Sequence, residues 1–333
     1  MPRHPSPFCI QHPLRFVARS CTHLTILTRA RATTKIVALA VATVAVLTAC
    51  GPAPSEAPES ANGTTIVIGS QATIENEIIA QLYGQALAFE GYDVKYNPGV
   101  GTRKQYLKAL SDGIIDFIPE YSGSLLSGLD SSSRLTETSS MLSIYPNLLQ
   151  KRELMVLEPA PADNGYALVV TKTIAAQATI VNIGDLASIG ASIAIGATPE
   201  FEGLPYGRSG LLSTYGVSGW SFVPIDDETG DLLVDALLDD DIQVAGVHAT
   251  APAILRDDLV VLGDPARIIA AENVLPLIRN DLYTPRLATI ANAVSAELTT
   301  KDLRELNALA IGSTNPTPES LARDWLEAHG LLG

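Results

Sequence analysis

Cysteine and histidine are almost missing from most of this chain. Its 333 residues include three cysteines, Cys9, Cys21 and Cys50, so none follows position 50. Of the five histidines, His248 and His329 alone follow it. These absences exclude a disulfide framework, a cysteine nucleophile and a cysteine-based metal site from residues 51–333. We expect no metal and no cofactor.

Sequence motifs of common enzymes are also missing. The chain contains no H-E-x-x-H zinc motif and no G-x-S-x-G nucleophile motif. Gly99-x-Gly101 lacks the third glycine and the downstream acid of a dinucleotide site. Carboxylates are plentiful, but no spacing pairs them as a hydrolase would require. We therefore expect that the protein is not an enzyme, with a two-acid hydrolase as the weaker alternative.

Basic residues are concentrated at the start of the chain. Residues 1–49 contain six basic residues and no acidic one. The remainder has 16 basic against 36 acidic residues, a net charge of −20, compared with −14 for the whole chain. A surface this acidic repels nucleic acid and anionic lipid headgroups, so no nucleic-acid partner is expected.

Residues 1–49 have the features of an export signal. Three basic residues at positions 29–35 precede an apolar run at 36–49, which is short for a membrane span. The run ends in L-T-A-C, which resembles the lipobox of bacterial lipoproteins. The resemblance implies a signal peptide at 1–49, a lipid on Cys50, and an extracytoplasmic protein anchored to the outer face of the membrane. An uncleaved N-terminal anchor is the alternative. The long segment before Arg29 indicates a later translation start.

Residues 51–63 are rich in proline, serine, glutamate and alanine and have no apolar period. This composition predicts a disordered tether after the lipidated cysteine, so we assign residues 50–63 to the anchor and its tether.

From residue 65 onward, short apolar runs alternate with segments of helical spacing. Thr65–Gly69, Asp93–Asn97 and Ile114–Ile118 are predicted strands with helices between them, the β-α-β-α-β start of a parallel sheet. A second such series spans 183–262. Residues 285–332 show helical spacing, and Pro146 predicts a break in a helix at 135–150.

The two series predict an α/β protein of two lobes. Lobe 1 comprises residues 64–165 and 272–333, and lobe 2 comprises residues 166–271. Two extended crossings would join them as a hinge around a cleft, an arrangement that closes on small ligands.

The stretch from Asp116 to Ser124 reads D-F-I-P-E-Y-S-G-S. Proline cannot continue a central strand, so Pro119 is predicted to end one. Glu120, Tyr121, Ser122 and Ser124 would then lie just past its carboxyl end, where open α/β sheets bind ligands. The alternative is an ordinary turn with a half-buried tyrosine.

Four segments, at 66–77, 115–124, 163–171 and 259–265, resemble the glycine betaine/choline/carnitine-type substrate-binding proteins of ABC importers. P-E-Y-[ST]-G after a strand is the most specific of them, and the resemblance covers about residues 64 to 332. It implies a type II periplasmic-binding-protein fold and an aromatic cage for a quaternary ammonium ligand. Permease and ATPase subunits would be the partners. A binding protein for another small polar solute, or a ligand-sensing lipoprotein without transport, is the alternative.

The resemblance assigns some ligand-binding residues directly. Tyr121 matches a cage tyrosine, and Ser124 matches a threonine that faces the ligand. Asn164 and Tyr166 match the family's Asn/Asp-x-Tyr at the first crossing. Tyr166 as a core tyrosine is the alternative reading.

Other positions depart from the family. His248 and Glu272 stand where it often has cage tyrosines, Leu204 where it often has an arginine, and Gln71 where many members have a lysine. We keep His248, Glu272 and Gln71 as ligand-site candidates; a core histidine, and a surface ion pair of Glu272 with Arg267 or Arg279, are the alternatives.

Taken together, these departures make the site more negative and less aromatic, because rings and cations are lost and a carboxylate is gained. A carboxylate can replace a ring in attracting a cation. The hypothesis is a site that no longer favours a zwitterion such as glycine betaine and suits a cation without a carboxylate, such as choline.

Overall fold

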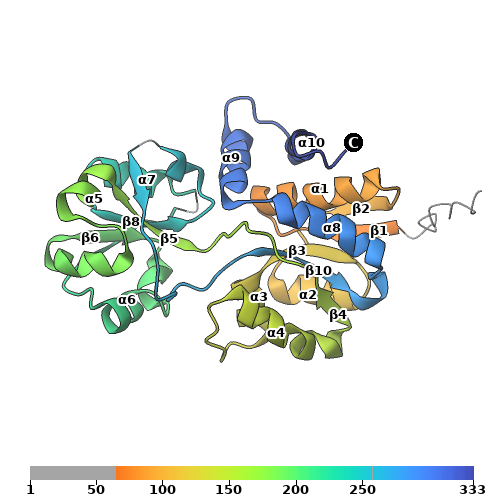
Figure 1. Cartoon of the computed structure of the whole chain (residues 1–333), viewed down its shortest axis with the longest axis horizontal. Coiled ribbons are helices and arrows are strands. Elements are labelled where there is room, and N and C mark those ends of the chain that lie inside the picture. The colour runs from red at the N-terminus through yellow and green to blue at the C-terminus, as the bar shows by residue number, and fades with distance from the viewer. Residues whose placement is uncertain (1–64, 228, 257) are drawn as a thin grey trace, which may run out of the picture. The chain divides into compact units, whose positions relative to one another are not determined.

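The computed structural model describes residues 65–227, 229–256 and 258–333, which form two β-sheets with helices around them (Figure 1). The first sheet has the strand order β2-β1-β3-β10-β4 and the second β7-β6-β8-β5-β9. The predicted signal peptide, Cys50 and the tether lie outside the described residues. Two α/β lobes, as predicted, account for the part that is described.

The first sheet is mixed. Its strands are β1 (Thr65–Gly69), β2 (Asp93–Asn97), β3 (Phe117–Tyr121), β4 (Leu154–Val156) and β10 (Val274–Arg279). β1 pairs in parallel with β2 and β3, whereas β10 runs antiparallel to β3 and β4. The predicted β-α-β-α-β start is therefore confirmed.

Helices cover both faces of this sheet. They are α1 (Ile74–Phe89), α2 (Arg103–Ser111), α3 (Ser122–Leu129), α4 (Thr138–Leu149), α8 (Pro285–Glu297), α9 (Thr300–Ile311) and α10 (Pro318–Ala328), with the short turns η1 (Gln150–Arg152) and η6 (Asn280–Leu282). Neighbouring strand residues alternate between two cores: Val274 packs with α1 and α8–α10, and Leu275 packs with α2–α4. We call this sheet and these helices the first lobe.

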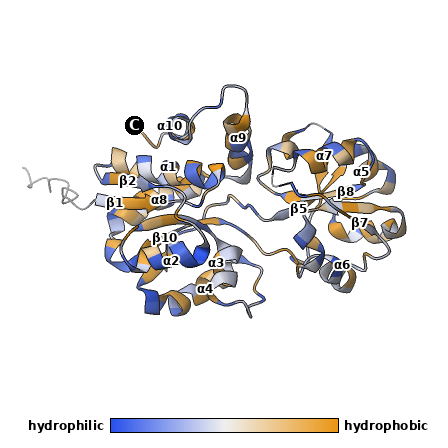
Figure 2. Cartoon of the chain, turned by 180° about the vertical axis from the view of Figure 1, so that it is seen from behind, coloured by the Kyte–Doolittle hydropathy of each residue, from blue (hydrophilic) through white to orange (hydrophobic). Residues whose placement is uncertain are grey.

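The second lobe has the same layered plan. Its strands are β5 (Tyr166–Thr171), β6 (Ala194–Ala197), β7 (Ser221–Pro224), β8 (Val244–His248) and β9 (Leu259–Val261). Its helices are α5 (Lys172–Ala178), α6 (Arg208–Tyr215) and α7 (Asp231–Leu238), with η2 (Ile183–Ser188), η3 (Gly190–Ser192), η4 (Pro199–Gly203) and η5 (Pro252–Leu255). Apolar residues run along the strands of both sheets (Figure 2).

Pro119 does not end its strand, contrary to the prediction. β3 continues to Tyr121, and Pro119 faces Pro276 of β10. The Pro276 carbonyl accepts from Leu157 N at 2.9 Å. The Pro276 carbonyl therefore points away from β3. The two prolines therefore face each other where no inter-strand hydrogen bond is required. Glu120 and Tyr121 lie inside the strand, and only Ser122 and Ser124 follow it.

The predicted break at Pro146 is also wrong. Helix α4 continues through Pro146 to Leu149, and the Pro146 carbonyl accepts from the Gln150 amide. Pro146 is exposed. A proline costs a helix one backbone hydrogen bond, and on an exposed face water can replace it.

The chain passes between the sheets twice, from β4 to β5 and from β9 to β10, and the two crossings pair with each other. Asn164 N donates to Glu272 O at 3.0 Å, and Asp163 forms an antiparallel bridge with Asn273. The Asp163 carboxylate accepts from Gly165 N at 2.6 Å and from Glu272 N at 3.0 Å. One side chain thus fastens both crossings. The predicted lobe limits stay predictions.

We expect Asp163→Ala to lower the free energy of unfolding by about 1–3 kcal/mol, because two backbone donors lose their acceptor. Denaturant unfolding would measure it. Asp163→Asn keeps an acceptor oxygen and should retain most of the stability. Glu158→Ala, at an exposed carboxylate near the start of the first crossing, is the control. Equal stability of the alanine variant and wild type would contradict this role of Asp163.

Candidate functional site

A cavity of about 540 Å³ brings together six of the seven predicted site residues. They are Gln71, Tyr121, Ser124, Asn164, His248 and Glu272. The wall also includes Thr73, Glu75, Asn76, Arg103, Thr229, Thr250, Asn307 and Ile311. The walls therefore come from the first turn of α1, the end of β3, both crossings, the loop after β8, and α9.

The start of α1 supplies one wall of the cavity. Thr73 caps the helix by accepting from Asn76 N at 3.3 Å. The cap fixes the first turn so that Glu75 and Asn76 point inward, with only 7% and 4% of their surface exposed. A carboxylate near a helix N-terminus also interacts favourably with the helix dipole.

Tyr121 lies at the junction of the cavity and the first lobe's core. Its side chain is 8% exposed and packs in the core beside α1. Its hydroxyl donates to Glu75 Oε1 and accepts from Asn76 Nδ2 at 3.4 Å. Burial, and after it the Glu75 carboxylate, raise the pKa of Tyr121 well above its ordinary value. The phenol is thus a fixed donor at the cavity wall.

Glu120, the residue before Tyr121, is fully buried beneath the cavity. It accepts from Arg103 Nε at 2.7 Å, from Arg103 Nη2 at 3.2 Å and from the Tyr106 hydroxyl. Arg103 is the first residue of α2 and the positively charged residue among the described cavity lining. Its charge is therefore taken up by Glu120.

Glu272 is held by α3. Its carboxylate accepts from Ser124 N at 2.8 Å and from Ser124 Oγ at 2.9 Å. Burial raises the pKa of Glu272 to about 7; the two Ser124 hydrogen bonds oppose this shift, and Glu120 adds to it.

The surface pairing considered for Glu272 is not formed. Arg267 pairs with Glu137, and Arg279 pairs with Asp116 and Asp281. Glu272 therefore faces the cavity without either arginine.

Asn164 and His248 meet where the first crossing enters the second lobe. Asn164 Oδ1 accepts from Thr250 Oγ1 at 2.6 Å, and the Asn164 carbonyl lies 3.1 Å from His248 Nδ1. His248 ends β8 and is exposed, so it is hydrogen-bonded but is not a core histidine.

Helix α9 connects the two walls. Asn307 Nδ2 donates to Glu75 Oε2 at 2.6 Å and to the Thr250 carbonyl at 3.1 Å. Arg304, one turn earlier, donates to the Ala249 carbonyl. α9 thus holds the loop after β8 against the first turn of α1.

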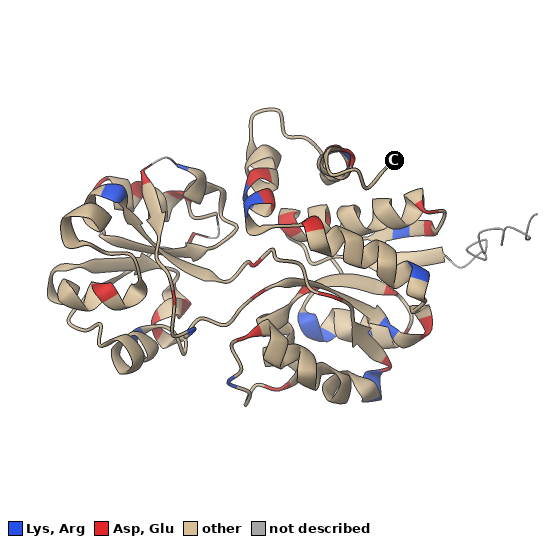
Figure 3. Cartoon of the chain, in the orientation of Figure 1, with Lys and Arg blue, Asp and Glu red and all other residues tan. Residues whose placement is uncertain are grey.

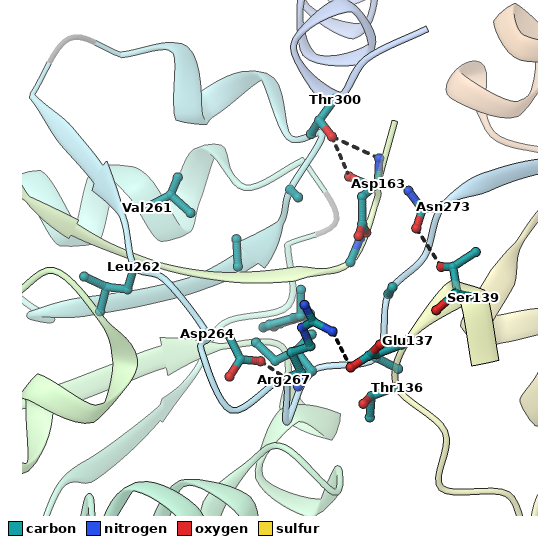
Figure 4. A pocket seen from close by; sticks show the side chains of 18 of the residues that line it. Thr136, Glu137, Ser139, Asp163, Val261, Leu262, Asp264, Arg267, Asn273 and Thr300 are labelled. Atoms are coloured by element: carbon teal, nitrogen blue, oxygen red, sulfur yellow. Dashed lines mark hydrogen bonds and ion pairs between the residues drawn. The ribbon is translucent and has the colours of Figure 1, made fainter. Parts of the chain in front are cut away.

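Tyr166 does not line this cavity. It contributes to a second one of about 580 Å³ on a different set of residues, including Glu137, Asp163, Asp264 and Arg267 (Figure 4). There, Arg267 forms its ion pair with Glu137, and Thr300 binds the backbone of Asp163.

The Tyr166 ring belongs to an aromatic cluster of the second lobe. It stacks on Phe201 at 5.3 Å, lies 5.7 Å from the Tyr206 ring and meets His248 edge-on at 5.6 Å. Through His248 this cluster reaches the edge of the first cavity. Leu204, where the family often has an arginine, is partly buried two residues before Tyr206.

Sequence reasoning missed several lining residues, chiefly Glu75, Asn76, Arg103, Thr250 and Asn307. Glu75 and Asn76 lie in a segment that carried the family resemblance, so a signal for them was present. Asn307 reaches the site only because α9 returns to α1 after more than 200 residues. No local pattern marks it.

The cavity is lined by many polar side chains and is poor in rings. Tyr121 is the only Tyr, Phe or Trp among the described residues that line it. Three buried amide atoms of the described lining have no hydrogen-bond partner: Gln71 Nε2, Asn76 Oδ1 and Asn307 Oδ1. Buried polar atoms without a hydrogen-bond partner are uncommon in folded proteins, and each one calls for a physical explanation.

We expect Tyr121→Phe to lower the free energy of unfolding by about 1–3 kcal/mol, because Glu75 loses a donor in buried surroundings. Thermal or denaturant unfolding would show it. Tyr283→Phe removes a hydroxyl from an exposed tyrosine and is the matched control. If both variants unfolded with the same free energy as wild type, the Tyr121–Glu75 hydrogen bond would not stabilise the fold.

Comparison with known proteins gives one family. A family model described as the substrate-binding domain of ABC-type glycine betaine transport systems matches residues 64–328. A glycine-betaine-binding protein of Pseudomonas aeruginosa is 25% identical over 283 residues, 82% of this chain and 90% of its own. The glycine betaine-binding protein YehZ of Escherichia coli is 21% identical over 286 residues, with 80% and 90% covered.

Solved structures agree on the fold. A glycine betaine/carnitine/choline ABC transporter crystal structure superposes with a TM-score of 0.73 at 21% identity, covering 80% of this chain and all of that one. Ligand-free YehZ from Escherichia coli gives 0.68 at 20% identity, covering 80% and 99%. The predicted type II periplasmic-binding-protein fold is confirmed.

Proposed function

The chain belongs to the family of substrate-binding domains of ABC-type glycine betaine transport systems, and we propose that it captures a cation without a carboxylate, such as choline. The cavity around Tyr121 and Glu272 would be the ligand site. The ligand would then pass to the permease and ATPase subunits of an importer.

The charge of the cavity wall is the observation that supports this ligand class. Glu75 and Glu272 line the cavity, and the charge of Arg103 is engaged by Glu120. A positive ligand would be attracted to these carboxylates, and a ligand carboxylate would meet them without a free cation to bind. The molecule around the site is also acidic, with Asp and Glu on the helices of both lobes (Figure 3).

The ring of Tyr121 would add cation–π attraction. A quaternary ammonium has no N–H to donate, so ring faces and carboxylates are what select it. His248 lines the cavity, and the Tyr166 ring meets His248 edge-on at 5.6 Å. We propose that Tyr121, Ser124, Asn164, Tyr166, His248, Glu272 and Gln71 contact the ligand when the lobes close on it.

A second candidate is a binding protein for another small polar solute. The unpartnered amide atoms of Gln71, Asn76 and Asn307 favour it, because a ligand with several hydrogen-bonding groups would satisfy them. Choline, with one hydroxyl, would satisfy at most part of this set.

Membrane attachment belongs to the proposal too. The residues that carry it, the apolar run and Cys50, lie outside the described residues. In the described part of the chain, no helix has the length and apolar character to cross a bilayer. We propose that the protein is extracytoplasmic and held by a lipid on Cys50, with residues 51–63 as its tether.

Titration calorimetry with choline and with glycine betaine tests the ligand class. We expect choline to bind at least about tenfold more tightly, roughly 1.4 kcal/mol, because the betaine carboxylate would oppose Glu75 and Glu272. Equimolar potassium chloride controls for ionic strength. Tighter binding of glycine betaine would defeat the proposal.

A pair of substitutions tests the ring of Tyr121. Tyr121→Phe keeps the ring face and should bind choline within about threefold of wild type. Tyr121→Leu removes it and should lose about 3- to 30-fold, the range of one cation–π contact. Circular dichroism would confirm that both variants are folded at the titration temperature. Equal losses in the two variants would show that the ring does not contact the ligand.

A further inference from the structure

The half-buried carboxylate of Glu272 has no cation partner among the described residues. It lies in the cavity wall and accepts from Ser124, through the backbone amide at 2.8 Å and the hydroxyl at 2.9 Å. The nearby guanidinium of Arg103 pairs with Glu120, at 2.7 Å. The ion pairs of the described residues leave Glu272 without a partner.

Glu75, the other carboxylate of the wall, is held by two side chains. Its Oε1 accepts from the Tyr121 hydroxyl and its Oε2 accepts from Asn307 Nδ2 at 2.6 Å. Each of the two carboxylates therefore accepts two hydrogen bonds. Glu272 differs because the charge of Glu120 also acts on it and raises its pKa.

The charge of Glu272 interacts with Glu120 on β3 and Arg103 on α2, and it also acts on Tyr145 of α4 and on Tyr206, which precedes α6. Ser124 on α3 donates to Glu272 directly. Burial is the main cause of its raised pKa, about 7; Ser124 and Arg103 lower it, and Glu120 raises it further. A buried carboxylate in this position is neutralised either by a proton or by a cation.

We propose that Glu272 holds a proton in the empty cavity and gives it to solvent when a cation binds, so that capture exchanges one cation for one proton. The net charge of the cavity is then the same before and after binding. This inference rests on the proposed function and adds a specific role: Glu272 is the counter-ion that selects a positive ligand.

Calorimetry with choline chloride, in two buffers of different ionisation enthalpy, counts the protons exchanged. At pH 6 we expect release of about one proton per choline, and almost none at pH 8.5. Below pH 7 the affinity should fall by about tenfold for each pH unit, because protons compete with the ligand.

Glu272→Gln mimics the protonated side chain and cannot release a proton. It should bind choline more weakly than wild type at pH 8.5, with no proton release and an affinity that does not change with pH. Glu202→Gln makes the same chemical change at an exposed glutamate paired with Arg208 and should behave as wild type. Proton release that persists in Glu272→Gln would assign the exchange to another group and overturn the inference.

The two proposals fail in different ways. Choline binding at pH 6 without proton release would overturn the exchange and leave the proposed function standing. If neither choline nor glycine betaine binds at either pH, the proposed function fails.

A ligand-free measurement then still tests Glu272. Its pKa in the folded protein is above the ordinary glutamate value, so between about pH 4.5 and 7 the folded state holds a proton that the unfolded chain has lost. Stability contributed by this group therefore falls as pH rises through that window. The melting temperature of Glu272→Gln should rise relative to wild type from pH 5 to pH 8. A constant difference would overturn the inference.

Discussion

Removing carboxylates from water is the constraint on which the rest of this site depends. Three glutamates lie in or under the cavity wall, and each is compensated differently. Glu120 is fully buried and takes the charge of Arg103. Glu75 accepts from Tyr121 and from an asparagine of α9. Glu272 accepts from Ser124 and has no ion pair among the described residues. Because burial penalises an unpaired charge, a positive ligand near Glu272 would compensate it.

The same carboxylate lies at the hinge. Glu272 and Asn164 are on opposite crossings, and their backbones are hydrogen-bonded to each other at 3.0 Å. Asp163 ties the two crossings together next to them. A ligand held by Glu272 would therefore lie directly against the two crossings that join the lobes. The residues that bind the ligand would then also take part in closing the two lobes around it.

The ring content of the cavity separates this chain from an all-aromatic cage. Tyr121 is the single Tyr, Phe or Trp of the described lining, and its hydroxyl is committed to Glu75. The other rings, of Tyr166, Phe201 and Tyr206, form a stack in the second lobe. A cation between Tyr121 and Glu272 would lie between one ring face and one carboxylate. Fewer rings are required when a full negative charge is present.

Strand and helix order and the two-lobed plan were predictable from the sequence, because apolar periodicity is a local feature. The family resemblance pointed to six residues of the cavity, but it did not point to Arg103, Thr250 or Asn307. Pro119 and Pro146 were misread for a physical reason: whether a missing N–H matters depends on the neighbouring strand or solvent. The pairing of Arg103 with Glu120, of Glu272 with Ser124 and of Asn307 with Glu75 was decided only by tertiary structure. These partners are brought together by sheet order and by the return of α9, and a charged side chain can be assigned a role only once its competing partners are in place.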